Sequence, residues 1–189
     1  MSGTDTGSAA SRWVKRVTLF AARRFARRND GAAAVEFALV AAPFLALVFA
    51  ILETALVFFA GQVLETAAAD SARLILTGQA QKGGLSETQF KQEVCKRIYG
   101  LFDCDNGIKV DVRTYNSFSS ASMSKPIDSN GKVTFTPAYQ PGSPGDIVVV
   151  RLLYEWPVYV SLLGLNLSDL SNGKRLIMAT AAFRNEPYQ

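Results

Sequence analysis

The sequence contains no histidine and only two cysteines among its 189 residues. Without histidine, the chain cannot form a serine–histidine catalytic pair or supply the imidazole ligands that are common in zinc sites. It also has no glycine-rich phosphate loop and no Cys-x-x-Cys pair. A serine–lysine hydrolase is not excluded by composition, although no motif indicates one. We therefore expect a protein that is not an enzyme and that uses no metal and no cofactor.

The net charge of +4 is unevenly distributed along the chain. Residues 1–31 hold seven basic and two acidic side chains, which gives this leader a net charge of +5. The remaining residues hold 13 basic and 14 acidic side chains, a net charge of −1. The basic character belongs to the leader alone, so it does not indicate nucleic-acid binding.

A long apolar stretch, Ala32–Phe59, follows the leader and predicts a transmembrane helix. The 21 residues from Ala32 to Leu52 include a single charged side chain, Glu36. At a rise of about 1.5 Å per residue they reach roughly 30 Å, the thickness of the hydrocarbon core. The basic run before this span places the N-terminus in the cytoplasm, so the rest of the chain is expected to be exported.

Three residues within the stretch need an explanation. Glu36 costs free energy inside a bilayer; it either extends towards the cytoplasmic interface or has a designated charge partner. Pro43 lacks a backbone N–H and predicts a kink or a locally opened turn. Glu53 lies 21 residues beyond Ala32, which predicts that it marks the exit from the bilayer.

The residues around the start of the span carry a family resemblance. A basic leader, Gly31, four small or apolar residues, Glu36, Phe37 and an apolar helix are similar to a type IV prepilin processing site. The run Gly-Ala-Ala-Ala-Val-Glu-Phe-Ala-Leu-Val-Ala-Ala-Pro-Phe-Leu resembles the TadE/TadG-like pseudopilins of the tight-adherence (Flp) pilus, as does the C-terminal segment 183–188. The resemblance implies cleavage between Gly31 and Ala32 by a membrane prepilin peptidase.

Cleavage at that bond would make Glu36 the fifth residue of the mature chain. The new amine at Ala32 would lie one helical turn from Glu36, at the i, i+4 spacing at which opposite charges meet. In a fibre, Glu36 could instead pair with the amine of a neighbouring subunit. Either pairing compensates a charge that is costly to bury, and the sequence leaves both open.

The sequence divides into four parts: a leader (1–31), the transmembrane helix (32–59), an exported extension of that helix (60–77) and an exported head (78–189). In the extension, Ala60, Val63, Ala67 and Leu74 fall at helical spacing and predict a narrow apolar stripe. Gly78 is expected to end this helix. Residues 81–84 are expected to form a hinge.

The head is expected to begin with a helix over residues 86–99, because Ser86 and Gln89 form a capping-box pattern. Cys95 and Cys104 lie nine residues apart in a compartment expected to be oxidising, so we predict a disulfide between them. Asp103 and Asp105 flank Cys104 in a turn; a solvated loop is the simpler interpretation and a calcium site the alternative.

Three or four strands should complete the head. Residues 108–115 alternate between apolar and polar side chains, which predicts a half-buried strand. Residues 147–154 are apolar enough for a central strand that Pro157 ends, and 175–184 follow a turn at Asn172-Gly173. A short strand is also expected at 133–136. The predicted fold class is α+β, with one helix on a mainly antiparallel sheet.

The apolar segment 156–165 allows two interpretations. It either packs in the core of the head or forms an exposed patch that contacts a neighbouring subunit. Pro157 and Gly164 interrupt it, so it is too short to be a second span.

Two functional hypotheses follow. In the first, the chain is a minor pseudopilin that takes part in pilus assembly, with the prepilin peptidase, other pilins, an inner-membrane assembly platform and membrane lipids as partners. It would be a single-pass protein of the bacterial inner membrane with a periplasmic head, or part of an extracellular pilus. In the second, it is an exported binding module that keeps the span as an uncleaved signal anchor. Gly31 together with Glu36-Phe37 favours the first, because an inert anchor has no use for an acid at that position.

Overall fold

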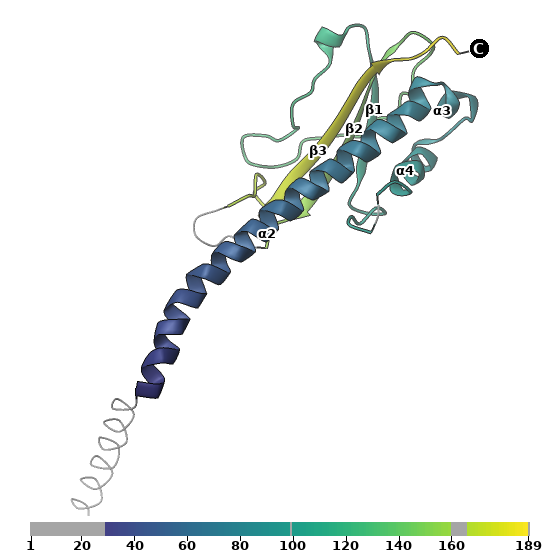
Figure 1. Ribbon diagram of the computed structural model, residues 1–189. Helices are drawn as coiled ribbons and strands as arrows, with labels where there is room; N and C mark the ends of the chain where they lie inside the picture. Colours follow the sequence, from purple (N-terminus) through teal and green to yellow (C-terminus); the bar gives the residue numbers. More distant parts are fainter. Residues whose placement is uncertain (1–28, 99, 160–165, 189) are drawn as a thin grey trace, which may run out of the picture. The chain divides into compact units, whose positions relative to one another are not determined.

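The computed structural model describes residues 29–98, 100–159 and 166–188. In chain order its elements are α2 (Asn29–Leu76), α3 (Gln79–Lys82), α4 (Glu87–Cys95), β1 (Lys109–Tyr115), the 3-10 turn η1 (Phe118–Ser120), β2 (Ile147–Pro157) and β3 (Lys174–Arg184) (Figure 1). The chain divides into two compact units, 1–48 and 49–189. A long apolar helix and a small domain built on an antiparallel sheet confirm the predicted α+β class.

The sheet has three antiparallel strands in the order β1-β2-β3, with β2 in the centre. The short strand expected at 133–136 does not form, because Val133 makes only an isolated bridge with Ile127. The chain following it covers the outer edge of β1 instead. The N–H of Val112 donates to the carbonyl of Ala138 (2.7 Å), and the N–H of Gln140 donates to the carbonyl of Val112 (2.8 Å).

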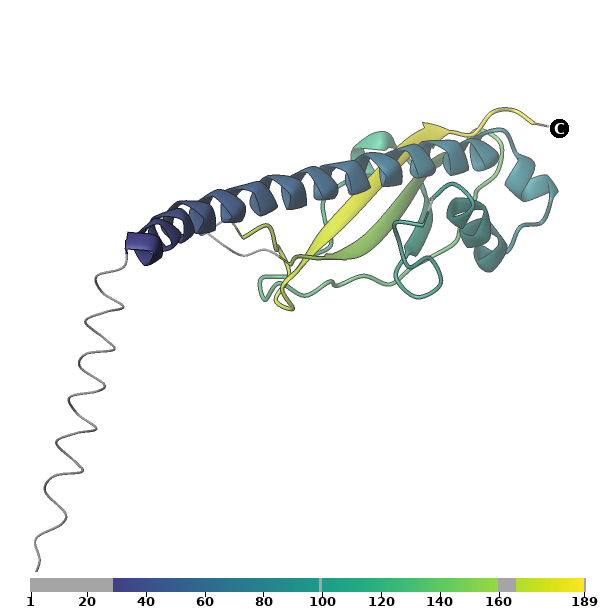
Figure 2. The same cartoon turned by 60° about the horizontal axis from the view of Figure 1, so that its bottom comes forward.

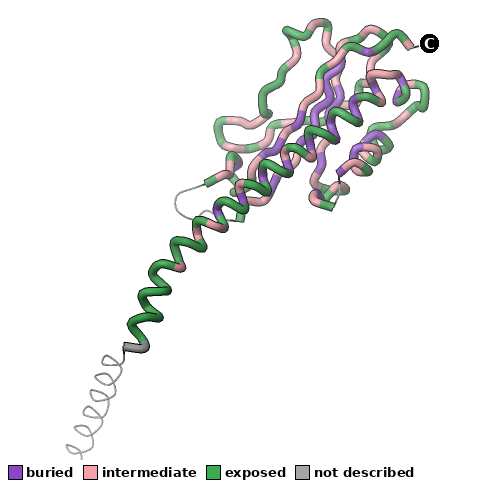
Figure 3. The backbone as a smooth tube through the Cα atoms, in the orientation of Figure 1, coloured by how far each residue is buried: buried purple, intermediate pink, exposed green. Residues whose placement is uncertain are grey.

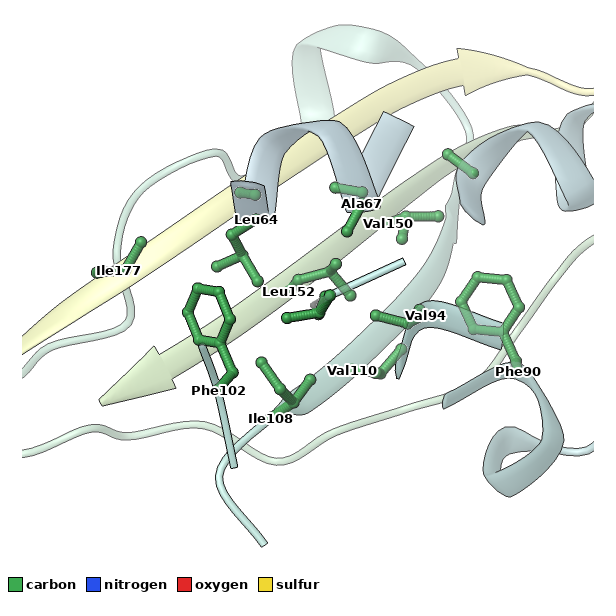
Figure 4. Close-up of a cluster of buried hydrophobic side chains, with 14 of the residues drawn as sticks. Leu64, Ala67, Phe90, Val94, Phe102, Ile108, Val110, Val150, Leu152 and Ile177 are labelled. Carbon is green, nitrogen blue, oxygen red and sulfur yellow. The ribbon is translucent and has the colours of Figure 1, made fainter. Parts of the chain in front are cut away.

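Two helices, α4 and the part of α2 that belongs to the second unit, cover one face of this sheet (Figures 1 and 2). The buried stripe of α2 follows helical spacing and is rich in alanine: Val57, Ala60, Leu64, Ala67, Ala68, Ala72 and Ile75. Leu64 and Ala67 point towards Val94 of α4 and Leu152 of β2 (Figure 4). Residues 60–77, expected to precede the head, thus supply much of its core. The predicted division of the chain into four parts stays a prediction.

The connection after α2 contains a short helix and is held in place by hydrogen bonds. Gly78 ends the helix as predicted, with a left-handed φ of 74°. Residues 79–82 form α3, and the side-chain amide of Gln81 donates to the carbonyls of Ile75 (3.2 Å) and Pro141 (2.8 Å). The prediction of a hinge at 81–84 is wrong, because Gln81 ties this turn both to the end of α2 and to a loop 60 residues further along the chain.

Helix α4 begins with the predicted capping box. The hydroxyl of Ser86 accepts from the N–H of Gln89, and the side chain of Gln89 accepts from the N–H of Ser86. Phe90 and Val94, one helical turn apart, are both buried. The helix ends at Cys95, earlier than expected, and Tyr99 lies outside the described residues.

The predicted disulfide joins Cys95 at the end of α4 to Cys104, with a Cα–Cα distance of 5.8 Å. We expect Cys95→Ser combined with Cys104→Ser to lower the free energy of unfolding by about 2–3 kcal/mol, because the unfolded chain is no longer constrained by the closed loop. Urea denaturation of the full chain with Trp13→Phe in detergent micelles, followed by the fluorescence of buried Trp156, measures the change. Added reductant should destabilise the parent protein and leave the double variant unaffected; equal stabilities without reductant would contradict the prediction.

Candidate functional site

The part of α2 in the first unit is apolar apart from its first residues and Glu36, and most of it is exposed (Figure 3). Its large exposed side chains are Val35, Phe37, Leu39, Val40, Phe44, Leu45 and Leu47. A helix that is apolar all round is stable only in contact with lipid or with other apolar surfaces. Among the described residues, α2 is also the one helix long and apolar enough to cross a membrane. This helix suggests a membrane anchor.

The four residues of the predicted processing site all lie in α2. Glu36 is exposed, and Phe37 beside it is 75% exposed. A Cβ atom placed on Gly31 would have no neighbouring side chain within 4 Å in the part of the chain that the structure describes. Contacts among the described residues therefore do not require glycine at position 31.

The second acid of α2, Glu53, has a different environment. Its side chain belongs to the second unit and is buried, with the residue only 6% exposed. Its carboxylate accepts a hydrogen bond from the backbone N–H of Tyr159, after the end of β2. Glu53 therefore acts as a buried hydrogen-bond acceptor inside the fold. The charge and hydropathy of the sequence did not predict this environment.

The apolar segment 156–165, which begins in the last two residues of β2, divides between the two interpretations that its sequence allowed. Trp156 is buried, and its ring meets that of Phe102 edge-on at 5.8 Å. Tyr159 is 82% exposed. Residues 160–165 lie outside the described residues, so the prediction for them stays open.

The C-terminal segment that carried part of the resemblance has a structural role. The side-chain amide of Asn185 donates to the carbonyls of Pro141 (3.0 Å) and Ser143 (3.1 Å), and the N–H of Glu186 donates to the carbonyl of Leu76 at the end of α2 (2.9 Å). The ring of Tyr188 lies against Gly78. Partial burial, and secondarily Asp146, raise the pKa of the Tyr188 phenol. The tail thus joins the end of α2 to the loop before β2.

A buried ion pair on the other face of the sheet was missed by the sequence analysis. Asp111 is fully buried and accepts from Arg151 (2.6 Å), which is itself nearly buried. It also accepts from Arg113 (2.9 Å), and this hydrogen bond is the main reason that the pKa of Arg113 is raised. The loop between β1 and β2 covers this face, where the ring of Phe135 lies 5.5 Å from the Arg151 guanidinium. Alternation along β1 had predicted a solvated polar face.

No group of three or more potential metal ligands comes together among the described residues. Both carboxylate oxygens of Asp111 are already hydrogen-bonded, by its two arginines and by the backbone N–H of Ala138, which donates at 2.9 Å. The arrangement of these polar groups stabilises the sheet and its loop.

These features define a class: a protein with an N-terminal helix of membrane-spanning length and a small α+β domain that contains one disulfide among its described residues. The family model described as TadE-like protein matches residues 31–73, which confirms the resemblance to that family over this segment. No curated protein and no solved structure matches the chain. The match starts at Gly31 and includes Glu36 and the buried stripe of α2 as far as Ala72, but not Ile75.

Proposed function

We propose that this protein is a minor pseudopilin that takes part in assembling a tight-adherence (Flp) pilus. In this proposal α2 anchors it in the bacterial inner membrane, its leader is cytoplasmic and its head is periplasmic. A prepilin peptidase cleaves it between Gly31 and Ala32, and it then associates with other pilins and with the assembly platform in the membrane. It performs no catalysis. The observation that carries the proposal is the TadE-like match, which begins at Gly31 itself.

Two features of the chain support this proposal. Glycine at 31 is not required by packing, whereas a residue without Cβ suits the close approach of a peptidase to the backbone. The disulfide between Cys95 and Cys104 is suited to an oxidising compartment such as the periplasm. Gly31 and Ala32 are helical in the structure, so cleavage requires local unwinding of α2 around this bond.

The mature N-terminus tests processing directly. We expect mass spectrometry of C-terminally tagged protein, purified from the membrane of a host with its own prepilin peptidase, to find a chain that begins at Ala32. Gly31→Val should abolish this product because its branched side chain blocks the peptidase groove, whereas Ala33→Val should be cleaved normally. A parent chain that begins near Met1 would instead support the alternative, an uncleaved signal-anchored binding module of the cell envelope.

A second prediction concerns Glu36. Glu36→Ala should leave cleavage largely intact but reduce the number of pili, because the mature amine of Ala32 loses its charge partner in the membrane or the fibre. Electron microscopy and the yield of sheared filaments measure the loss. Glu65→Ala is the matched control, since Glu65 is exposed on the same helix beyond the predicted span. Normal numbers of pili with Glu36→Ala would remove the proposed role of this carboxylate.

A further inference from the structure

The exposed surface of α2 remains apolar well into the folded second unit. Beyond Phe49, the large exposed side chains are Ile51, Leu52, Leu56, Phe58 and Phe59. From Gln62 onwards the exposed side chains of α2 are mostly polar or charged: Gln62, Glu65, Thr66, Asp70 and Arg73. The opposite side of the same turns is packed in the core of the head. The change from apolar to polar surface therefore lies between Phe59 and Gln62, within the head.

No exposed charge interrupts this apolar surface. Between Phe37 and Leu64 the sequence has one charged residue, Glu53, and its carboxylate is turned into the fold, where it accepts from the N–H of Tyr159. A carboxylate facing lipid would cost on the order of 2.5–3.5 kcal/mol at the centre of a bilayer, and less near its surface. Burial against the end of β2 removes this obstacle to lipid contact.

The hydrogen bond to Glu53 also places Tyr159 beside this part of α2. Its side chain is 82% exposed, and exposed tyrosines are typical of the interface between lipid and water. A groove of about 310 Å³ lies beside the same turns of α2, lined by α2 residues from Thr54 to Glu65, by Lys125 and Leu167, and by the consecutive residues 175–178 of β3. Its walls combine apolar Val57 and Phe58 with Arg175, with the acidic Glu65 and with Lys125, whose ammonium pairs with Asp169 (2.6 Å).

We propose that the head is seated on the outer leaflet of the membrane through a lipid-contacting surface made of Ile51, Leu52, Leu56, Phe58, Phe59 and Tyr159. The occupant is phospholipid, because these residues follow the proposed anchor in the same apolar stretch of α2 and the one acid among them, Glu53, is buried. The lipid–water boundary then lies between Phe59 and Gln62. This inference rests on the proposed membrane anchorage and adds to it that the folded head itself is part of the membrane contact.

Depth-dependent fluorescence quenching tests the surface. The full chain, with Trp13→Phe, is reconstituted in phosphatidylcholine–phosphatidylglycerol nanodiscs that contain lipids brominated near the carboxyl end of the acyl chain. Phe58→Trp and Tyr159→Trp probe the surface, and Thr66→Trp is the matched control on an exposed position of α2, about 12 Å further along the helix axis. Leu45→Trp, with lipids brominated deep in the chain, reports separately on the anchor. Trp156 is buried and contributes equally to every variant.

We expect the brominated lipids to quench Phe58→Trp and Tyr159→Trp at least about twofold more than Thr66→Trp, as an interfacial position requires. Quenching of Leu45→Trp alone would overturn the lipid-contacting surface and leave the anchor standing. Blue-shifted but unquenched emission from Phe58→Trp would show that protein, such as a second copy, covers this surface, and would overturn the inference. Loss of quenching in Leu45→Trp would overturn the anchorage itself.

Discussion

Asp111→Ala should lower the free energy of unfolding by about 3–5 kcal/mol, the cost of leaving a buried charge without its partner. Asp111 is fully buried, and the variant strands Arg151, whose side chain is only 8% exposed. It also removes the acceptor for the N–H of Ala138, which holds the segment beside β1. Urea denaturation of the full chain with Trp13→Phe in detergent micelles, read from Trp156 fluorescence, measures the change.

Two further variants separate this mechanism from a general sensitivity to substitution. Asp105→Ala removes an exposed carboxylate and should change the free energy of unfolding by no more than about 0.5 kcal/mol. Asp111→Leu combined with Arg151→Met replaces the pair by apolar side chains and should recover most of the lost stability. A loss below about 1 kcal/mol in Asp111→Ala would mean that the ion pair is not desolvated as its burial indicates.

Gly78→Ala should lower the free energy of unfolding by about 2–4 kcal/mol, through backbone strain and overpacking together. The φ of 74° is costly for any residue with a Cβ. That Cβ would also lie 2.2 Å from the Tyr188 ring, which is packed against the end of α2. The same denaturation experiment measures the loss.

Gly84→Ala is the matched control for Gly78→Ala. Gly84 also has a positive φ, 59°, but a Cβ there meets nothing within 4 Å, so only the backbone strain remains. Gly78→Ala should therefore be the more destabilising by at least about 1 kcal/mol. Tyr188→Ala should remove most of that difference when combined with Gly78→Ala, because the two residues are in contact. Equal losses from the two glycine variants would show that the tail does not pack against Gly78.

The local elements were predictable because their signals lie within a few residues of one another. The capping box at Ser86 and Gln89, the left-handed glycine at 78 and the apolar run of β2 each depend on short-range chemistry, and each is found in the structure. The disulfide followed from two cysteines and an expected compartment. The anchor helix followed from the length and composition of one stretch.

The interactions that were missed join residues that are distant in sequence. Glu53 bonds to Tyr159, 106 positions away, and no local pattern distinguishes a buried acid at the end of a span from an exposed one. Asp111 and Arg151 are 40 positions apart. The alternation of apolar and polar residues along β1 predicted that this face of the sheet is exposed, whereas in the structure the loop after β1 covers it. Gln81 was placed in a hinge because its partner Pro141 lies 60 positions away.

The sequence by itself determined the anchor-like helix, the resemblance around Gly31 and Glu36, the cysteine pair and the three strands of the sheet, because hydrophobic length, periodicity and motif spacing are properties of consecutive residues. Only the tertiary structure decided that the second part of α2 forms the core of the head, that the tail holds the end of this helix and that Glu53 faces inward. Which face of a helix is buried depends on the shape of the sheet that it meets, and that shape exists only once the chain has folded.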